Sequence, residues 1–236
     1  FLAYSEGRAV VPPVGHLEFE SPPGDMHIKY GMIDGMNSYV IKVASGFYEN
    51  PKLGLSSSNG LMMVFDKNTG QLKGILLDEG HLTDLRTALA GAVVAKLMAP
   101  KRVHHIGVIG TGVQGRLQAQ YLKDIVGCNR IVVYGRSPDK RALYKKDMEA
   151  LGFEVEITDD PAIVAQKANY IVTTTSSKRA LLQADDIQSG THITAMGADS
   201  PGKQELDSEI FERATMIICD SIEQCKSQGE CQHLSN

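Results

Sequence analysis

The stretch Ile106-Gly107-Val108-Ile109-Gly110-Thr111-Gly112-Val113-Gln114-Gly115 decides how this chain folds. Its first four residues form an apolar run that is typical of a short buried strand, and residues 117–125 have helical spacing. A strand that enters a helix through a G-x-G-x-x-G loop is the phosphate-binding turn of dinucleotide-binding domains. The stretch therefore predicts a dinucleotide site. The alternative is a strand, turn and helix that bind nothing.

The three glycines of this loop have separate physical tasks. Gly110 makes the tight turn, Gly112 lets a pyrophosphate approach bare backbone, and Gly115 lets the helix pack on the strand. The helix N-terminus then offers free N–H groups and a positive dipole end to the phosphates. We therefore expect cofactor contacts from five consecutive residues, Gly110, Thr111, Gly112, Val113 and Gln114.

The residues after the next expected strand, Arg130–Tyr134, indicate which dinucleotide binds. NAD-specific domains usually place Asp or Glu there, where it accepts hydrogen bonds from the ribose hydroxyls. This chain has Gly135-Arg136-Ser137 instead. Because an arginine and a serine suit a 2′-phosphate, the sequence favours NADPH, with NADH still possible and Arg136 and Ser137 as contacts. The alternative for Arg136 is a solvated surface side chain.

Composition excludes several classes of protein. The chain has 236 residues, of which 42% are hydrophobic and 22% charged, with a net charge of −4, so it is not an intrinsically disordered protein. No apolar run approaches the ~20 residues of a spanning helix, so we expect no membrane partner. The pI of about 6.0 and the lack of a basic stretch argue against a nucleic-acid partner.

The cysteines and the two ends of the chain predict its setting. The four cysteines form no C-x-x-C pair and have no metal-ligand spacing, so we expect free thiols, no metal site and a cytoplasmic protein. No signal peptide opens the sequence. The chain starts at Phe1 rather than Met and stops without an evident final element, so we expect residues to be missing at both ends.

Two textures meet near Pro100. Before it, strand-like runs separated by turn residues predict an antiparallel meander, and residues 12–25, with four prolines, predict a loop or a sheet edge. A helix should follow from Thr83, its N-cap, to Met98. The expected strands of this part are Met26–Ile33, Tyr39–Phe47, Leu61–Phe65 and Leu72–Leu77.

After Pro100, strands alternate with helical runs, which predicts crossover connections and a parallel sheet of an α/β protein. The expected strands here are His105–Ile109, Arg130–Tyr134, Glu154–Ile157, Tyr170–Thr174, His192–Met196 and Met216–Cys219.

Two of these strands end in polar residues, at the sheet edge where open α/β sheets bind ligands. The hydroxyls of residues 173–177 either line the nicotinamide side, with Thr174 as the candidate contact, or cap the following turn. Asp199 follows the other strand among turn-forming residues. A carboxylate there can orient a substrate ammonium or a water, or relay a proton. The alternative is an Asx-turn or a helix cap.

Three basic residues of the first hundred also draw interest. Lys42 lies in an apolar run, where a lysine is costly without a partner, and Arg86 lies in the first turn of a helix rich in Ala and Leu. Lys29 lies in the strand before Lys42. A substrate carboxylate would provide a partner for these cations, and an arginine can hold it bidentately. The alternative is that they point to solvent.

At these residues the sequence resembles the ornithine cyclodeaminase/μ-crystallin family. The resemblance covers almost the whole chain, and its motifs occur in the family's order. They are Lys42-Val43-Ala44-Ser45, Asn50-Pro51-Lys52-Leu53-Gly54-Leu55, Leu82-Thr83-Asp84-Leu85-Arg86-Thr87-Ala88, Gly110-Thr111-Gly112-Val113-Gln114 and Gly197-Ala198-Asp199-Ser200-Pro201-Gly202-Lys203-Gln204-Glu205-Leu206-Asp207.

The resemblance implies an α/β fold with a Rossmann dinucleotide-binding domain over residues 100–220. It also implies an α/β substrate and dimerisation lobe over residues 1–99, incomplete here, to which residues 221–236 begin to return. It implies a homodimer. Lys42 and Arg86 match the family's substrate-carboxylate contacts, and Arg8 matches a third basic contact. Asp199 matches the acidic residue at the reacting carbon, and we expect Asp199 and Lys42 to serve catalysis.

The family is chemically mixed, and two departures bear on the choice. The cyclodeaminases have an acidic residue after the second strand, where this chain has Arg136, and a glutamate where we align Lys29. A lysine there would repel the second amino group of ornithine. We therefore expect an NAD(P)H-dependent reductase of cyclic imino acids, a ketimine reductase of proline metabolism, with Δ1-pyrroline-2-carboxylate as leading substrate. The alternatives are an ornithine cyclodeaminase with catalytic NAD, an alanine dehydrogenase, or a crystallin-like NADPH-binding protein.

Overall fold

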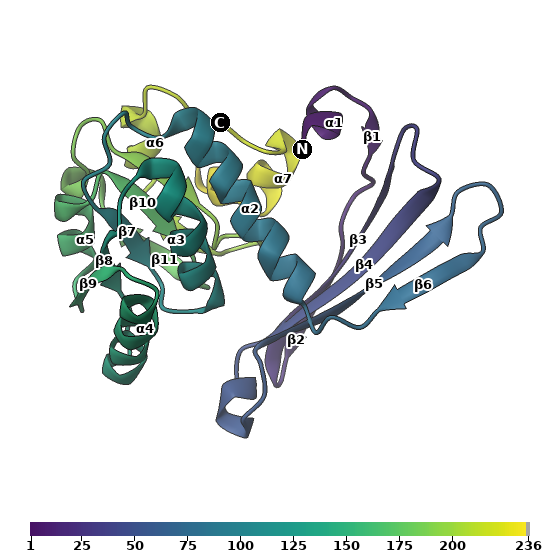
Figure 1. Ribbon diagram of the computed structural model, residues 1–236, viewed down its shortest axis with the longest axis horizontal. Coiled ribbons are helices and arrows are strands. Elements are labelled where there is room, and N and C mark those ends of the chain that lie inside the picture. Colours follow the sequence, from purple (N-terminus) through teal and green to yellow (C-terminus); the bar gives the residue numbers. More distant parts are fainter. Residues whose placement is uncertain (235–236) are drawn as a thin grey trace. The chain divides into compact units, whose positions relative to one another are not determined.

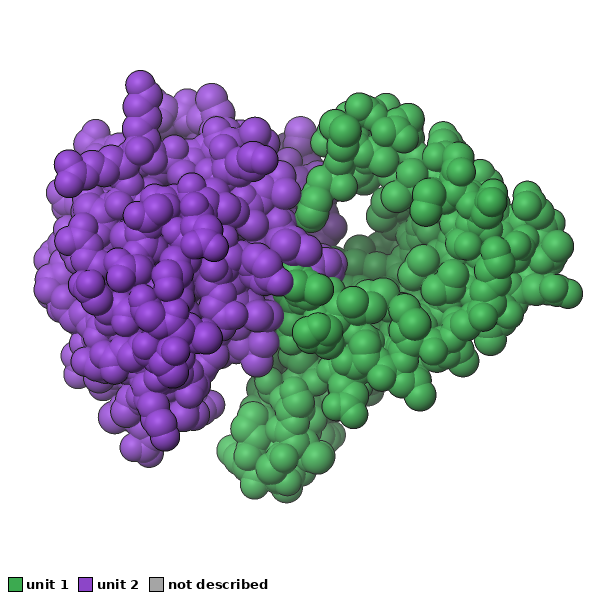
Figure 2. Space-filling model, in the orientation of Figure 1, with its two compact units in different colours: residues 1–85 green, residues 86–236 purple. Residues whose placement is uncertain are grey.

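The computed structural model describes residues 1–234, and the chain divides into two compact units, Phe1–Leu85 and Arg86–Asn236 (Figure 2). The first unit is built almost entirely of antiparallel strands. The second alternates strands with helices (Figure 1). Each unit has its own sheet.

The first unit contains a six-stranded antiparallel sheet in the order β1-β3-β4-β5-β6, with β2 paired to β3. The predicted meander is confirmed, because β3, β4, β5 and β6 pair in chain order. The proline-rich stretch before them contributes β2 at the edge of the sheet. The elements are α1 Leu2–Ser5, β1 Ala9–Val10, β2 Gly15–Glu20, β3 Pro23–Ile33, β4 Ser38–Phe47, η1 Asn50–Leu53, β5 Ser58–Asp66 and β6 Leu72–Leu76.

The turn between β5 and β6 is built around one carboxylate. Asp66 Oδ1 accepts the N–H groups of Asn68 at 2.8 Å and Thr69 at 3.1 Å, and its Oδ2 lies 2.8 Å from Lys73 Nζ. The Lys73 ammonium and these turn N–H groups lower the pKa of Asp66 to about 2. These contacts hold the turn that joins β5 to β6.

One face of this sheet is apolar. Side chains alternate across a strand, so the register places every second residue of β2 to β6 on a common face. The large apolar side chains on that face that are at least 40% exposed include Leu17, Phe19, Tyr30, Leu72 and Ile75. The opposite face carries the lysines discussed below.

The second unit contains a five-stranded parallel sheet in the order β12-β10-β7-β8-β9. This order, with helical crossovers, is the strand order of dinucleotide-binding domains, so the predicted α/β class and parallel sheet are confirmed. The elements are β7 Ile106–Ile109, α3 Val113–Val126, β8 Arg130–Tyr134, α4 Pro138–Ala150, β9 Glu154–Thr158, α5 Pro161–Lys167, β10 Tyr170–Thr173 and β12 His192–Ala195.

Two hydrophobic clusters cover the two faces of this sheet. Alternate residues of β7, such as Ile106 and Val108, pack with Leu122 of α3 and Tyr144 of α4. Ile109 at the end of β7 faces the other way and packs with Val164 of α5. The strands are buried on both faces, as the near-continuous apolar runs of the sequence indicated.

Helix α2, His81–Met98, begins two residues earlier than expected. Thr83 is therefore not its N-cap: it lies inside the first turn, and Asp78 Oδ2 accepts the Leu82 N–H at 2.6 Å. The buried side of α2 consists of small residues, Ala88, Gly91, Ala92 and Ala95. A Cβ added at Gly91 would lie 2.0 Å from Gln118 Oε1 of α3. The small residues on this side therefore let α2 and α3 pack closely.

The connection after β10 departs from the expected alternation. Instead of a helix it holds β11, Lys178–Leu182, which pairs in parallel with β13, Gln204–Leu206, in a separate two-stranded sheet. The remaining elements are η2 Ala184–Asp186, α6 Glu209–Arg213, α7 Ile222–Ser227 and η3 Glu230–His233. The β11–β13 pair matters below because it brings Glu205 to the sheet edge.

The predicted strand Met216–Cys219 is wrong, because these residues adopt no strand. Their apolar side chains are exposed, with Met216 at 66% and Ile218 at 62%. Strand propensity alone does not make a strand without a pairing partner, and this run pairs with none of the described strands. The four cysteines are free thiols, and Cys219 Sγ lies 3.8 Å from Cys231 Sγ.

Candidate functional site

The glycine loop lies at the carboxyl end of β7, between β8 and β10 of the sheet. Gly110 has a φ of +119°, and a Cβ there would lie 2.6 Å from Thr174 Oγ1. A Cβ on Gly115 would lie 2.3 Å from the Gly110 carbonyl oxygen. Both glycines are therefore required by the packing of the turn itself, as the motif predicted.

Gly112 is different, and it tests whether the loop fits a phosphate group. It is the N-cap of α3, with a φ of −81° that any residue can adopt, and a Cβ added there would meet no protein atom within 4 Å. Neither backbone conformation nor internal packing requires glycine at this position. The missing side chain leaves the first N–H groups of α3 open to close approach by an external group, as a dinucleotide pyrophosphate needs, so the loop fits that group.

Arg116, which the sequence analysis did not single out, holds the glycine loop in place through hydrogen bonds to its backbone carbonyls. Its guanidinium donates to the carbonyls of Thr111 and Gly112 and is paired with Asp147 of α4 at 2.8 Å. It also lies over the Tyr144 ring, 5.1 Å from the centroid, while the Tyr144 hydroxyl donates to the Gly115 carbonyl at 3.0 Å. These contacts tie the loop carbonyls to α3 and α4.

The two residues expected near an adenosine ribose follow β8. Ser137 is the N-cap of α4, and its Oγ accepts the Lys140 N–H at 3.4 Å. Arg136 is exposed, and within residues 1–234 its guanidinium has no hydrogen bond or ion pair. Gly135 packs against the glycine loop, because a Cβ there would lie 2.7 Å from Thr111 Cγ2. The structure thus places the end of β8 beside the loop.

Thr174 lies on the other side of the glycine loop, just after β10. Its hydroxyl donates to the Ile109 carbonyl at 3.1 Å and its backbone N–H donates to the same oxygen at 2.8 Å. The hydroxyl therefore ties β10 to β7 directly beside Gly110. A role of Thr174 toward a cofactor stays a prediction.

Asp199 lies in the loop that follows β12, on the same edge of the sheet. Its side chain is 59% exposed, and its Oδ1 lies 2.6 Å from Lys203 Nζ and 3.3 Å from Ser200 Oγ. The Lys203 side chain, in contrast, is only 9% exposed. Lys203 is therefore a buried cation that orients the exposed Asp199 carboxylate. The sequence analysis quoted Lys203 within a motif but gave it no role in the site.

A second buried carboxylate lies behind this loop. Glu205 of β13 is fully buried and accepts the backbone N–H groups of Thr175 and Gly197. Glu230 of η3 accepts the N–H groups of Glu205 and Leu206. The sequence displayed Glu205 only as one letter of a motif, and no periodicity marked it as a buried acid.

In the first unit, Lys29 and Lys42 are directly opposed in the β3–β4 register, and Lys42 is only 8% exposed. Like charges opposed in this way are destabilising unless an anion or a further partner lies near them. The same face carries His27, opposite His16 in β2, with the ring centroids 4.8 Å apart and His27 Nε2 3.6 Å from Asp25 Oδ1. Sequence reasoning did not identify these histidines.

The two predicted arginines are in different places. Arg8 precedes β1 and is paired with Glu6. Arg86 is the first residue of the second unit and lies in α2. That Arg8 and Arg86 act together with Lys29 and Lys42 on one ligand stays a prediction.

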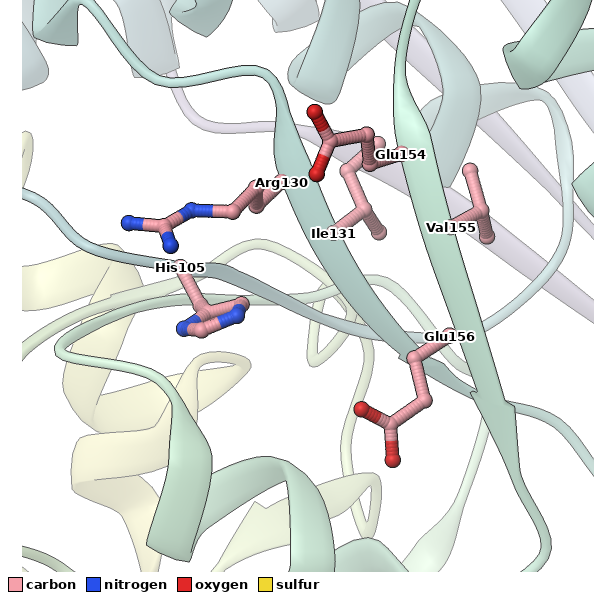
Figure 3. A pocket seen from close by; sticks show the side chains of 6 residues that line it. All are labelled: His105, Arg130, Ile131, Glu154, Val155 and Glu156. Atoms are coloured by element: carbon pink, nitrogen blue, oxygen red, sulfur yellow. The ribbon is translucent and has the colours of Figure 1, made fainter.

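A shallow hollow of about 230 Å³ lies at the opposite edge of the parallel sheet, where β8 and β9 begin (Figure 3). It is lined by His105, Arg130, Ile131, Glu154, Val155 and Glu156. Burial lowers the pKa of His105, with the nearby Arg130 adding to the effect. None of the predicted site residues lines this hollow, so the candidate site is the edge that carries the glycine loop.

Comparison with known proteins agrees with this geometry. A model of the ornithine cyclodeaminase/mu-crystallin family matches residues 1–236. The chain belongs to this family. Membership confirms the resemblance that the motifs indicated. An uncharacterized cyclodeaminase of Sinorhizobium fredii is 36% identical to it over 235 residues, which are 99% of this chain and 71% of the relative.

Two solved members of the family have the same fold. The Δ1-pyrroline-2-carboxylate reductase of Thermococcus litoralis, in complex with NADH and L-proline, has a TM-score of 0.90 and 27% identity. The match covers 97% of this chain and 71% of that one. An archaeal alanine dehydrogenase dimer with bound NAD has a TM-score of 0.88 and 31% identity, over 97% and 69% of the two chains.

Among the residues that the structure describes, none of the helices combines the length and the apolar composition that crossing a membrane demands.

Proposed function

We propose that this protein is an NAD(P)H-dependent reductase of the C=N bond of a cyclic imino acid, with Δ1-pyrroline-2-carboxylate as leading substrate. One observation carries the proposal. A phosphate-fitting glycine loop and an Asp199 carboxylate oriented by buried Lys203 lie on the same edge of one parallel sheet. That arrangement pairs a dinucleotide site with a group able to hold a proton.

The cationic residues of the site are proposed to bind the carboxylate of the substrate. In the proposed mechanism Lys42 and Arg86 bind it, with Lys29 and Arg8 contributing further positive charge. The burial of Lys42, a residue that is 8% exposed, supports this role, because a hydrogen bond between a buried cation and a carboxylate is stronger than one between neutral groups. Holding the substrate by its carboxylate fixes the direction of the C=N bond, which is a large part of catalysis by proximity.

Asp199 is the proposed proton-holding group. It keeps the substrate nitrogen protonated, directly or through a water, and it stabilises the positive charge of an iminium. Lys203 and Ser200 fix the direction of its carboxylate. When bound, the nicotinamide dinucleotide supplies the hydride for the imine carbon. The residues for holding it are Gly110, Thr111, Gly112, Val113 and Gln114, with Thr174 on the nicotinamide side.

We propose NADPH as the preferred cofactor. The exposed Arg136, next to the capped start of α4 at Ser137, is suited to a 2′-phosphate. Arg136→Ala should then weaken NADPH binding about tenfold or more and leave NADH binding unchanged, since one charged hydrogen bond contributes about 1.5–3 kcal/mol. Equal effects on both cofactors would contradict this role. NADH is the alternative cofactor, and it is the ligand of the Thermococcus reductase.

Other chemistries within the family are the alternatives. An ornithine cyclodeaminase needs a partner for the second ammonium of ornithine, and the opposed Lys29 and Lys42 disfavour it. An alanine dehydrogenase would use the same cations on a smaller substrate. A crystallin-like binding protein would bind NADPH without turnover.

We further propose a homodimer formed through the apolar face of the first unit's sheet. The support is the exposure of large apolar side chains on that face, including Leu17 at 54% and Ile75 at 51%. The solved archaeal alanine dehydrogenase is a dimer.

The test is to follow loss of NADPH absorbance after adding Δ1-pyrroline-2-carboxylate, with NADH beside it. Asp199→Ala should reduce kcat/KM about 100-fold or more, the usual contribution of a positioned acid or base. Asp185→Asn, which removes a carboxylate that is 88% exposed, is the control and should change nothing.

If the Asp199→Ala variant keeps full turnover, Asp199 is not the proton-holding group. If the unaltered protein oxidises neither cofactor, the next assay is ammonia release from ornithine with NAD⁺. Tight NADPH binding without turnover in either assay would favour the crystallin-like alternative.

A further inference from the structure

The strands β10 and β12 pair from Tyr170↔His192 to Thr173↔Ala195, and one more bond follows, from the Met196 N–H to the Thr173 carbonyl at 3.0 Å. Beyond that point the backbone of each strand leaves the sheet. The segment after β10 carries Thr174, and the segment after β12 carries Asp199. Two backbone N–H groups follow, those of Thr175 and Gly197. Both donate to the carboxylate of Glu205, Thr175 N–H to Oε1 at 2.6 Å and Gly197 N–H to Oε2 at 3.0 Å.

This junction is tightly packed. The Glu205 side chain is 0% exposed. A Cβ added at Gly197 would lie 2.3 Å from Glu205 Oε2 and 2.3 Å from the Thr175 carbonyl oxygen. The carboxylate therefore packs directly against the Gly197 backbone and the end of the Thr174–Thr175 segment.

Several groups face Glu205 from the surrounding elements. Thr173 and Thr175 face it from the end of β10, and Glu230 faces it from η3. Glu230 accepts the Glu205 N–H at 2.7 Å, so the strand that carries Glu205 is itself anchored by a carboxylate. His233 of η3 bonds through Nε2 to the Lys203 carbonyl at 2.7 Å. Lys203 in turn pairs with Asp199.

The surroundings of Glu205 raise the pKa of its carboxyl, so that its charge changes near pH 7. Burial raises the pKa of Glu205 to about 7, against the lowering effect of the Thr173 and Thr175 groups. Burial also raises the pKa of Glu230, and the Glu205 and Leu206 N–H groups oppose that shift. A protonated carboxyl keeps one good acceptor oxygen, whereas its hydroxyl oxygen is a poorer acceptor, so protonation weakens the bond to one of the two N–H groups.

We propose that Glu205 is the positioning residue of this site: as a carboxylate it clamps the Gly197–Asp199 segment to the Thr174–Thr175 segment, and protonation opens the clamp. The catalytic consequence rests on the proposed function, because Asp199 is then correctly placed only while Glu205 is ionised. Glu205 touches no reacting atom in this scheme and acts through the segment that carries Asp199.

The first test needs no turnover. In NMR spectra of the protein, the Thr175 and Gly197 amide protons should shift together between pH 5.5 and 8.5, with a midpoint near 7. In Glu205→Gln, whose side chain has nearly the same shape but presents N–H groups to one of the two donors, neither amide should titrate. Amide shifts that do not change with pH in the unaltered protein would overturn the proposal.

The second test is kinetic and uses the ratio of the two proteins' rates at each pH, so that pH effects common to both proteins cancel. The kcat of the unaltered protein divided by that of Glu205→Gln should be on the order of 10 to 100 at pH 8.5, the cost of a misplaced catalytic segment. The ratio should fall toward 1 at pH 5.5, where Glu205 is protonated. Glu212→Gln in α6 removes an exposed carboxylate and should leave kcat unchanged at every pH.

A ratio that stays constant with pH would show a merely structural role and overturn the proposal. If Glu205→Gln does not fold, the amide titration of the unaltered protein decides alone. If the protein has no turnover but both amides titrate near pH 7, the proposed function fails and the clamp stands.

Discussion

At the scale of single residues, Gly112 and Gly115 show how one motif combines binding with packing. Gly112→Ala should fold normally, because the added Cβ meets no atom, and should weaken NADPH binding about tenfold or more, the size expected when phosphate approach to N–H groups is blocked. Gly115→Ala should lower the free energy of unfolding by about 1–3 kcal/mol, because its Cβ would overlap the Gly110 carbonyl. Fluorescence titration and urea unfolding measure the two effects, and a folding defect in Gly112→Ala would contradict the assignment.

How much of the site the sequence predicts also depends on the residue. The glycine loop was predictable, because the G-x-G-x-x-G spacing between a strand and a helix is a local pattern: Gly110 and Gly115 are needed for the turn and its packing, and Gly112 leaves the first N–H groups of α3 open. Arg116, Lys203 and Glu205 were not predicted as part of the site, although two of them stand inside quoted motifs. Their roles depend on partners such as Asp147, which lies 31 residues from Arg116 in the sequence. Contacts of that range depend on the folded sheet, and a local pattern carries no sign of them.

At the scale of elements, the packing of α2 on α3 through Gly91 carries a prediction. Gly91→Ala should lower the free energy of unfolding by about 1–3 kcal/mol, since its Cβ would lie 2.0 Å from the buried Gln118 side chain. Gly74→Ala is the matched control: a Cβ there meets nothing within 4 Å, and stability should change little. Urea unfolding followed by circular dichroism measures both, and equal effects would show that α2 and α3 are not closely packed.

Elements with strong local signals were predicted well, and those that depend on pairing were not. The parallel strands and α3 follow from apolar runs and helical spacing, and Arg130–Tyr134 matches the structure at both ends. Residues 216–219 are also an apolar run, but they pair with none of the strands in residues 1–234 and stay irregular. The three-residue β13 was missed because it exists only through its pairing with β11.

At the scale of the whole molecule, the exposed apolar sheet face predicts self-association. Ile75→Glu should raise the dimer dissociation constant about tenfold or more, because it would bury a charge without a partner in the proposed interface. Leu143→Glu on α4 is the control, with a similar exposure of 54% in the other unit, and should not affect assembly. Light scattering over a range of concentrations measures both, and identical behaviour of the two variants would place the interface elsewhere.

Stability of the whole fold should also depend on pH through Glu205. Its pKa is raised on folding from the ordinary value of 4.5 to about 7, so the folded state binds the proton more tightly than the unfolded state does. This contribution to the stability of the folded state is fully present below pH 4.5 and is lost as the pH rises through 7.

The difference in unfolding free energy between the unaltered protein and Glu205→Gln should therefore fall by about 2–3 kcal/mol from pH 5 to pH 8. Burial lowers the pKa of His192 and so acts in the opposite direction, but it is present in both proteins and cancels in the difference. Urea unfolding at pH 5, 6, 7 and 8 measures the difference, and a value that rises with pH would mean that the ionised carboxylate is the better-stabilised form in the folded protein.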